Sequence, residues 1–368
     1  MRASLEPLPT AQRPAPAGYP CSVASSNDLD SSVANTLVAL ATDLTIRDGV
    51  VEIPGEFALQ HGGRLAAVRI AWRIVGPASA PVVCALGGIS GGRKVCLSED
   101  PQQAWWSRIA GPDRPLDANR FRILSFDYLG GSGQSTGPAP GAAFPSVSSY
   151  DQAECLARLL DHLGLRSLHA IVGGSYGGMV ALAFAERYPD KVAQLLIIGA
   201  ADRPHPMATA WRSVQRQIVR FAVDCNRPKE GLQLARALAM ATYRSPEEFA
   251  ARFGGAPSPD SERFEFPVES YLFARGADYA SRYRPESFLC LSESIDLHRV
   301  DAERIFVPTT VIAVREDQLV PINDVRAMVA RLPSAQLHEI SSIYGHDAFL
   351  KETEQLRRIF ALALEAAS

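Results

Sequence analysis

The sequence predicts an α/β fold in which helices flank a mostly parallel sheet and a helical cap is inserted. Two observations lead to this fold class. Short apolar runs, typical of strands buried on both faces, alternate with helical patterns bounded by Gly or Pro. The alternation stops in residues 204–300, where helical patterns follow one another, and resumes in residues 301–368. Alternating strands and helices form parallel sheets with right-handed crossovers, so the interruption is interpreted as an insertion.

The individual elements follow in chain order. The apolar alternation in VVEIPGEFAL and LAAVRIAWRIVG predicts an antiparallel hairpin, with a turn at His61 to Gly63. Buried strands are predicted in PVVCALGG, FRILSFDYLG, LHAIVGGS, VAQLLIIGA, TTVIAVRED and AQLHEISS. Core helices are predicted in DQAECLARLLDHLGL, GGMVALAFAERYPDKV and NDVRAMVARLP, and cap helices in QRQIVRFAVDC, EGLQLARALAMATY and SPEEFAARF.

Four segments are expected from these patterns. Residues 1–48 are rich in Pro, Ala and Ser, and they predict a poorly ordered leader with a short helix at residues 34–44. Residues 49–203 and 301–368 are expected to form the two parts of the α/β core, and residues 204–300 the helical cap.

Composition excludes several classes of partner. The chain has 368 residues, 47% hydrophobic, which is enough for one large α/β domain with an inserted subdomain. A formal net charge of −3 gives no basic field to attract nucleic acid or an anionic membrane, so neither partner is expected. Six cysteines without CxxC pairs, and no apparent secretory signal, favour a reduced, cytoplasmic protein without a metal site.

The sharpest motif is GGSYGG, in which Ser175 follows a predicted strand and precedes a predicted helix. This is the G-x-S-x-G nucleophile elbow of the α/β-hydrolase fold, where glycines permit a tight strand-to-helix turn that leaves the serine exposed. The helix N-terminus also offers N–H groups to a developing oxyanion. The strand and helix on the correct sides make an incidental Gly-rich turn a poor explanation, so Ser175 is the predicted nucleophile.

A serine hydroxyl needs a base, and this fold supplies its partners in the chain order serine, acid, histidine. Asp317 ends the strand pattern TTVIAVRED, and His346 lies in SSIYGHDAFLKE before the last helix. Glu316 and Asp324 are rival acids, because an error of one residue at a strand end would turn the side chain elsewhere. We expect Asp317 to orient His346, and His346 to deprotonate Ser175.

An oxyanion hole needs two N–H donors, one from the residue after the nucleophile and one from an earlier loop. Tyr176 supplies the first of these in the predicted elbow. The second is expected near Gly88 or Ile89 in LGGISGG, where glycines let the backbone approach a substrate. A phosphate-binding loop is a poorer account, because GGISGGRK lacks the Walker spacing.

Over residues 50–355 the chain resembles the homoserine O-acyltransferases, which acylate L-homoserine from an acyl-coenzyme A in methionine biosynthesis. The shared segments are AWWSRIAGPDRPLDANRFRILSFDYLGGSGQSTGP, GGSYGGMVALAFAERYPDKV, SVQRQIV, ATYRSPEEFAARFG, FPVESYL, SESIDLHRVD and YGHDAFL. The resemblance implies that Arg216 contacts the homoserine carboxylate and that Asp347 receives its ammonium group. The alternative interpretation, without substrate contact, is that Arg216 is a solvated arginine of the cap and Asp347 is a helix N-cap.

The resemblance also implies a mechanism and an assembly. Ser175 would take the acyl group from acyl-CoA, the co-substrate, and His346 would activate the homoserine hydroxyl in a ping-pong reaction. No bound cofactor is expected, and the family suggests a homodimer built through the cap. GGISGGRKV and the short region after STGP are similar to a subgroup that transfers succinyl groups, so Arg93 or Lys94 is a candidate partner for a succinyl carboxylate. Both equally fit solvent-exposed basic residues, so acetyl and succinyl donors stay open.

Other activities use the same residues. An esterase-type hydrolase would share the triad, but a simple ester needs no paired ionic clamp. L-serine or a natural-product alcohol is an alternative acceptor. A non-catalytic binding protein of this fold would usually lack a triad residue, and all three are present here.

Overall fold

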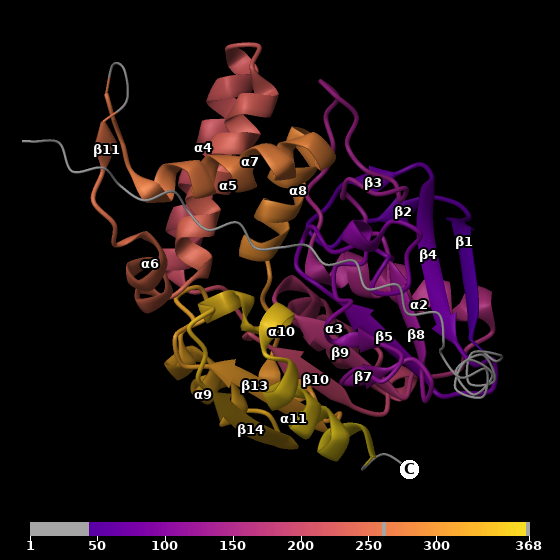
Figure 1. Ribbon diagram of the computed structural model, residues 1–368. Helices are drawn as coiled ribbons and strands as arrows, with labels where there is room; N and C mark the ends of the chain where they lie inside the picture. Colours follow the sequence, from indigo (N-terminus) through magenta and orange to yellow (C-terminus); the bar gives the residue numbers. More distant parts are fainter. Residues whose placement is uncertain (1–43, 260–262, 366–368) are drawn as a thin grey trace, which may run out of the picture. The chain divides into compact units, whose positions relative to one another are not determined.

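The computed structural model describes residues 44–259 and 263–365. Their centre is an eight-stranded sheet in the order β1, β4, β8, β5, β9, β10, β13, β14 (Figure 1). The strands are β1 (Thr45–Ile53), β4 (Val68–Gly76), β5 (Val82–Leu86), β8 (Arg122–Phe126), β9 (Ala170–Gly174), β10 (Leu195–Ile198), β13 (Thr309–Val314) and β14 (Ala335–Ile340). The β1–β4 and β4–β8 pairs are antiparallel and the other pairs are parallel, which confirms the predicted mostly parallel sheet.

Helices cover both faces of this sheet. They are α2 (Ser149–Leu163), α3 (Tyr176–Arg187), α9 (Ile322–Val329), the short α10 (Ala348–Lys351) and α11 (Thr353–Glu365). Side chains of one strand alternate between two apolar clusters, as the two-residue strand period requires. Leu195 and Ile197 of β10 pack in the cluster that contains α2 and α3, whereas Leu196 and Ile198 pack in the cluster that contains α11.

Short elements complete the core. β2 (Phe57–Ala58) pairs with β3 (Arg64–Leu65) around the predicted turn at His61 to Gly63, and β6 (Ala110–Gly111) pairs with β7 (Leu116–Asp117). The 3₁₀ helices are η1 (Pro101–Gln103), η2 (Pro189–Lys191), η3 (Ala302–Arg304) and η4 (Gly345–Asp347).

The predicted leader is too long at its C-terminal end. Residues 45–48 belong to β1, where Thr45 pairs with Gly76 and Asp48 with Arg73, so they are part of the sheet. The Asp48 carboxylate accepts hydrogen bonds from the Arg73 guanidinium at 2.8 to 3.0 Å. Cross-strand pairing therefore overrides the polar composition that suggested a leader. The helix predicted at residues 34–44 falls outside the described residues, apart from Leu44, which is not helical.

Between β10 and β13 the chain forms helices α4 (Pro206–Asp224), α5 (Pro228–Tyr243), α6 (Pro246–Phe253), α7 (Pro267–Arg282) and α8 (Pro285–Asp296). A short exposed ribbon of β11 (Ser258–Pro259) and β12 (Phe264–Glu265) joins α6 to α7. Each of the five helices begins with a proline, whose missing N–H costs nothing at the first helical position. These helices share an apolar cluster of their own around Val219, Leu232 and Phe288.

Figure 1 shows α4, α5, α7 and α8 gathered together beside the sheet. Helices α5 and α7 pack against each other, and so do α4 and α5. We call α4–α8 the cap. Within residues 44–259 and 263–365, no helix combines the length and the apolar character needed to cross a membrane.

Candidate active site

Ser175 lies at the sharp turn from β9 to α3. Its backbone has φ 56° and ψ −123°, a strained conformation for a residue other than glycine. The turn is possible because of its glycines: a Cβ on Gly173 would lie 2.4 Å from the Gly177 carbonyl oxygen, and one on Gly177 would lie 2.3 Å from that of Leu86. The sequence pattern therefore produces the backbone of a nucleophile elbow.

Ser175, His346 and Asp317 form a hydrogen-bonded chain. His346 Nε2 lies 2.8 Å from Ser175 Oγ, and His346 Nδ1 lies 2.6 Å from Asp317 Oδ2. The other oxygen, Asp317 Oδ1, accepts hydrogen bonds from the backbone N–H groups of Leu319 at 2.8 Å and Val320 at 3.0 Å. The turn after β13 thus fixes the carboxylate, which in turn orients the imidazole as a general base requires.

The two rival acids lie elsewhere. Glu316 accepts hydrogen bonds from Ser341 and Ser342 at the neighbouring strand, and these bonds, against the effect of its burial, lower the pKa of its carboxyl. Asp324 lies in the first turn of α9 and lines the cavity described below, with no bond to His346. Of the three acids weighed from the sequence, only Asp317 contacts the histidine.

His346 is buried, with 6% of its surface exposed. Burial alone lowers the pKa of the imidazole, but the Asp317 carboxylate and, more weakly, Asp347 outweigh it and raise the pKa above its ordinary value of 6.5. Arg212 acts in the opposite direction. The stronger base is suited to taking a proton from a hydroxyl group.

Three carbonyl groups in the loop after β5 accept hydrogen bonds that fix their orientation. Tyr128 Oη donates to the Gly87 carbonyl at 2.8 Å, the Gly91 N–H to the Gly88 carbonyl at 2.7 Å, and Tyr283 Oη to the Ile89 carbonyl at 2.8 Å. In a trans peptide the N–H points away from the preceding carbonyl, so these bonds also fix the N–H directions of Gly88 and Ile89. Both residues line the cavity at Ser175.

Tyr176 supplies the first N–H of α3, a position without a partner inside the helix and without a side-chain cap. Its side chain lies in the core, with its hydroxyl 2.5 Å from Ser294 Oγ. The predicted oxyanion donors Tyr176, Gly88 and Ile89 thus lie beside Ser175, and their role stays a prediction.

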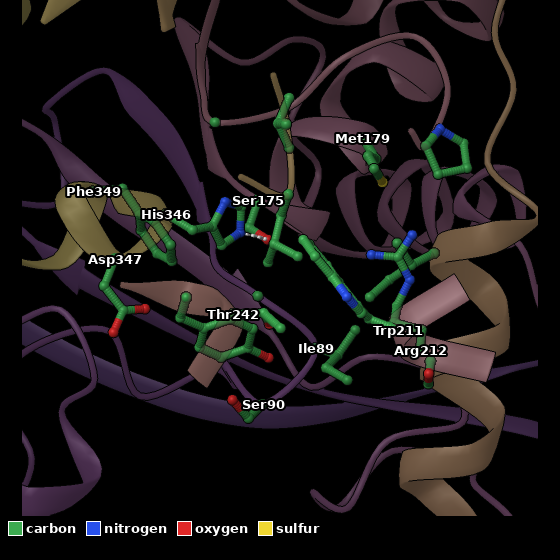
Figure 2. Close-up of a pocket in the computed structure, with 18 of the residues that line it drawn as sticks. Ile89, Ser90, Ser175, Met179, Trp211, Arg212, Thr242, His346, Asp347 and Phe349 are labelled. Atoms are coloured by element: carbon green, nitrogen blue, oxygen red, sulfur yellow. Dashed lines mark hydrogen bonds between the residues drawn. The ribbon is translucent and has the colours of Figure 1, made fainter. Parts of the chain in front are cut away.

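A cavity of about 170 Å³ opens above Ser175 between the core and the cap. Figure 2 shows Asp347 and Phe349 on one side of the Ser175–His346 pair, and Trp211 and Arg212 on the other. Cap residues Trp211, Gln215 and Thr242 line it together with core residues Ile89 and Met179. Across the described part of the chain, no three His, Cys, Asp or Glu side chains are grouped as metal ligands.

Of the two arginines one turn apart on α4, Arg212 lines the cavity and the predicted Arg216 does not. Arg216 is buried behind the wall, where it donates to the Ser292 carbonyl at 3.0 Å and to Asp296 Oδ2 at 2.6 Å. Arg212 donates to Asp296 Oδ1 at 2.6 and 2.8 Å. The prediction for Arg216 is therefore corrected: α4 turns the neighbouring arginine to the cavity. The four-residue spacing, which puts both on one helix face, is the signal that sequence reasoning passed over.

Two guanidinium groups share one carboxylate in this cluster. Arg212 and Arg216 bind opposite oxygens of Asp296, and their side chains are 12% and 10% exposed. The two guanidinium groups and the single carboxylate together carry one net positive charge, which is buried at the cavity. A ligand carboxylate would complete the pairing.

Asp347 lies on the opposite wall, beside His346. Its Oδ2 accepts a hydrogen bond from Arg244 Nε at 2.9 Å, and Arg244 also binds Glu248. Because Arg244 is shared with Glu248, Asp347 can accept further hydrogen bonds from a ligand in the cavity. It directly precedes α10 but makes no side-chain capping bond there, unlike the helix N-cap weighed from the sequence.

Arg93 does not reach the Ser175 cavity. Its guanidinium binds the buried Asp127 carboxylate, Gln134 at 2.9 Å and Asp48 at 3.4 Å. It lines a separate groove together with Lys94, whose ammonium binds Gln103. The predicted contact of Arg93 with an acyl carboxylate is corrected accordingly, because Asp127 already neutralises it.

Comparison with known proteins agrees with this architecture. The alpha/beta hydrolase fold family matches residues 81–353, and the chain belongs to that family. Among solved structures, esterase E22 aligns with a TM-score of 0.77 at 20% identity, covering 87% of this chain and all of that one. The homoserine O-acetyltransferase from Bacillus anthracis aligns with the same TM-score at 17% identity, covering 88% and 98%.

Curated relatives narrow the family. A homoserine O-succinyltransferase from Xanthomonas campestris is 39% identical over 90% of this chain and 92% of its own length. A homoserine O-acetyltransferase from Thermus thermophilus is 36% identical over 70% and 71%, and a serine O-succinyltransferase from Litchfieldella anticariensis is 32% identical over 86% and 98%. The chain is a member of the homoserine O-acyltransferase family, which confirms the resemblance, and it is an acyltransferase.

Proposed function

We propose that this protein transfers an acyl group from an acyl-CoA to the hydroxyl of L-homoserine through an ester on Ser175. One observation carries the proposal: the hydrogen-bonded Ser175, His346 and Asp317 open into a cavity with a cationic wall at Arg212 and an anionic wall at Asp347. A serine triad alone suits any acyl transfer. The two charged walls fit an amino acid as the acceptor.

The first half-reaction forms the acyl-enzyme. His346 Nε2 takes the proton of Ser175 Oγ while the oxygen bonds to the thioester carbon, and the carbonyl electron pair moves to its oxygen. The N–H groups of Tyr176 and of Gly88 or Ile89 stabilise that oxyanion. Collapse of the intermediate breaks the C–S bond, and the departing CoA sulfur takes the proton from His346.

The second half-reaction reverses these roles. His346 takes the proton of the homoserine hydroxyl, whose oxygen attacks the Ser175 ester. Collapse breaks the bond to Ser175 Oγ, which recovers the proton from His346. Transfer outpaces hydrolysis only if water is held out, and the cap residues Trp211 and Tyr243 on the cavity wall support that exclusion.

Arg212 and Asp347 position the acceptor. The guanidinium of Arg212 shares its partner Asp296 with Arg216, so it has charge to offer the homoserine carboxylate. Asp347 accepts the ammonium group from the other side. The hydroxyl of a homoserine held between them is directed at Ser175 and His346, which lie between the two walls (Figure 2).

Both acetyl-CoA and succinyl-CoA are proposed as donors to be tested, since relatives of each specificity match this chain. L-serine is the second acceptor to be tested, because the serine O-succinyltransferase matches over 98% of its length. The pathway context that we propose is methionine biosynthesis in the cytoplasm. The exposed apolar side chains Val214, Phe221 and Leu234 on the cap support a homodimer formed through it.

CoA release by the purified protein tests the proposal. Acetyl-CoA and succinyl-CoA are each combined with L-homoserine, L-serine or no acceptor, and Ser175→Ala is the control. Homoserine-dependent release from one donor, lost in the variant, supports the proposal and identifies the donor. Release that is independent of any acceptor would instead indicate a hydrolase.

A further inference from the structure

A second cavity, of about 550 Å³, lies in the cap next to the catalytic one. Among the described residues that line it, six side chains are cationic and Asp278 is the one carboxylate. The cations come from α5, its C-cap residue, α6, α7 and α10; they are Arg236, Arg244, Arg252, Arg275, Arg282 and Lys351. Helices α5 and α7 pack side by side there (Figure 1). We call this space the basic cavity.

Half of these cations are paired with protein carboxylates. Arg244 and Arg252 bind Glu248, and Arg282 binds Asp278. Within the described residues, no carboxylate lies at ion-pair distance from Arg236, Arg275 or Lys351. The basic cavity therefore holds three positive charges without an ion-paired carboxylate in residues 44–259 and 263–365.

Arg236 is held in place without an acid. Its guanidinium carbon lies 4.6 Å from the Tyr279 ring centroid and 5.1 Å from that of Tyr243, and it donates to Tyr243 Oη at 3.3 Å. Aromatic faces orient a guanidinium but supply no full negative charge. Most of its N–H groups thus stay available to an anion.

Two further observations indicate that the site is suited to an anion. Burial and the neighbouring Arg244 charge lower the pKa of Lys351, as expected where cations are crowded together. Tyr279 lines the basic cavity with 7% of its surface exposed, and its hydroxyl has no hydrogen-bond partner. A buried hydroxyl without a partner is costly, and an anionic oxygen would satisfy it.

The basic cavity adjoins the catalytic site through shared lining residues. Arg236 lines both cavities. Tyr279 and Arg282 also line a groove that contains Ile89, Ser90 and Gly91, the loop predicted to carry an oxyanion donor. A ligand with its charged end in the basic cavity could therefore place its other end at Ser175.

We propose that the basic cavity binds the phosphate groups of the CoA donor. This inference rests on the proposed acyl-CoA chemistry and adds the site that recognises the nucleotide end. A carboxylate of homoserine or of a succinyl group carries one charge, whereas three unpaired cations match the several phosphate charges of CoA. The pantetheine arm then extends past Arg236 to bring the thioester to Ser175.

Binding of adenosine 3′,5′-bisphosphate, measured by calorimetry, tests the site without requiring catalysis. Arg275→Gln removes an exposed, unpaired cation, and Arg220→Gln is the matched control on α4, exposed and outside the basic cavity. Loss of one charge-assisted contact raises the Kd about tenfold in Arg275→Gln. The Kd also rises in Lys351→Gln, whereas Arg220→Gln keeps the wild-type Kd. Equal Kd values for Arg275→Gln, Lys351→Gln and wild type overturn the proposal, as does equal affinity for inorganic phosphate at matched ionic strength.

A kinetic comparison separates this inference from the proposed function. The ratio of kcat/KM for an acyl-CoA to that for the corresponding acyl-pantetheine falls about tenfold in Arg275→Gln. If wild type transfers from neither donor yet binds the bisphosphate in an Arg275-dependent way, the proposed transfer from acyl-CoA to homoserine fails and the nucleotide site stands. If wild type transfers acyl groups and Arg275→Gln keeps the donor ratio, the nucleotide site is overturned alone.

Discussion

The sheet core and the cap meet at one cavity but differ in how they are built. Strands β9, β10 and β13 consist almost entirely of buried apolar residues, and Leu196 is 0% exposed. The cap helices bury a smaller cluster and leave large apolar side chains in solvent, with Phe221 66% exposed. The core holds the triad through backbone turns, whereas the cap presents arginines and acids on helix faces.

This difference separates chemistry from recognition. The triad depends on strand ends and on contacts that leave no room for a Cβ, so its geometry tolerates little change. The cap contributes Arg212, Arg236 and Thr242 to the cavity, and these can change without disturbing the sheet. Substitutions in the core should therefore affect the rate of bond formation, and substitutions in the cap should affect which molecules bind.

The largest effect is expected for Ser175→Ala. Without Oγ no acyl-enzyme forms, so kcat falls by about 10⁴-fold or more. Steady-state CoA release measures the loss, and Ser281→Ala, an exposed serine on α7, is the control. Turnover near the wild-type rate in Ser175→Ala would show that the reaction does not pass through an ester on Ser175.

Asp317→Asn should lower kcat/KM by about 10³- to 10⁴-fold, because His346 loses the group that sets its tautomer. The pH profile adds a second readout. In wild type Asp317 raises the pKa of His346, so activity, which needs the neutral base, is lost as pH falls through a value above 6.5. In the variant this acid limb shifts to lower pH. Glu316→Gln should leave the limb in place; the same shift in both variants would contradict the assignment.

His298 connects the end of the cap to the core, and it tests stability. Its Nδ1 lies 2.7 Å from Ser149 Oγ and its Nε2 lies 3.1 Å from the Ala201 carbonyl. Burial lowers the pKa of His298 to about 4. The unfolded state, with a pKa near 6.5, binds a proton more readily, so the free energy of unfolding declines by about 3 kcal/mol as pH falls from 7 to 4.

Urea unfolding at several pH values measures this decline, with His298→Gln as the comparison. The variant is less stable at pH 7 but has a shallower dependence on pH between 6.5 and 4. Identical slopes for the two proteins would show that His298 does not link the cap to the core by this proton-dependent contact.

A smaller effect is expected for Arg212→Gln in the cap. Losing one charge-assisted contact to a carboxylate costs about 1.5–3 kcal/mol, so the KM for the acceptor rises about 10- to 100-fold. The exposed Arg220→Gln on the same helix is the control. If kcat falls while the KM for the acceptor is unchanged, Arg212 does not position the acceptor. Recognition of the acceptor would then not be a function of this cap residue.

The same division decides what could be predicted from the sequence. Ser175, Asp317 and His346 were found because each follows a strand or precedes a helix in a fixed chain order, which local patterns reveal. Arg216 was predicted from a motif match alone, and such a match carries no information on which turn of α4 borders the cavity. Both Arg212 and Arg216 bind Asp296 of α8, and the packing of the folded cap places only Arg212 on the cavity wall.

Contacts between distant segments explain the other differences between the sequence predictions and the structure. Arg93 looked available for an acyl group because Asp127, which neutralises it, is 34 residues away in the chain. Residues 45–48 looked like a leader because their pairing with β4 is not visible in their composition. The basic cavity draws on α5, α6, α7 and α10, whose cations are scattered in the sequence and meet only in the folded chain.

Intact-protein mass spectrometry tests whether Ser175 carries the acyl group between donor and acceptor. The protein is mixed with acetyl-CoA or succinyl-CoA without an acceptor, and L-homoserine is then added. We expect a mass gain of one acyl group on wild type, located on Ser175 by peptide mapping. The adduct is absent in Ser175→Ala, and homoserine discharges it far faster than water does. No adduct with either donor, or an adduct that water discharges as fast as homoserine does, would contradict this role of Ser175.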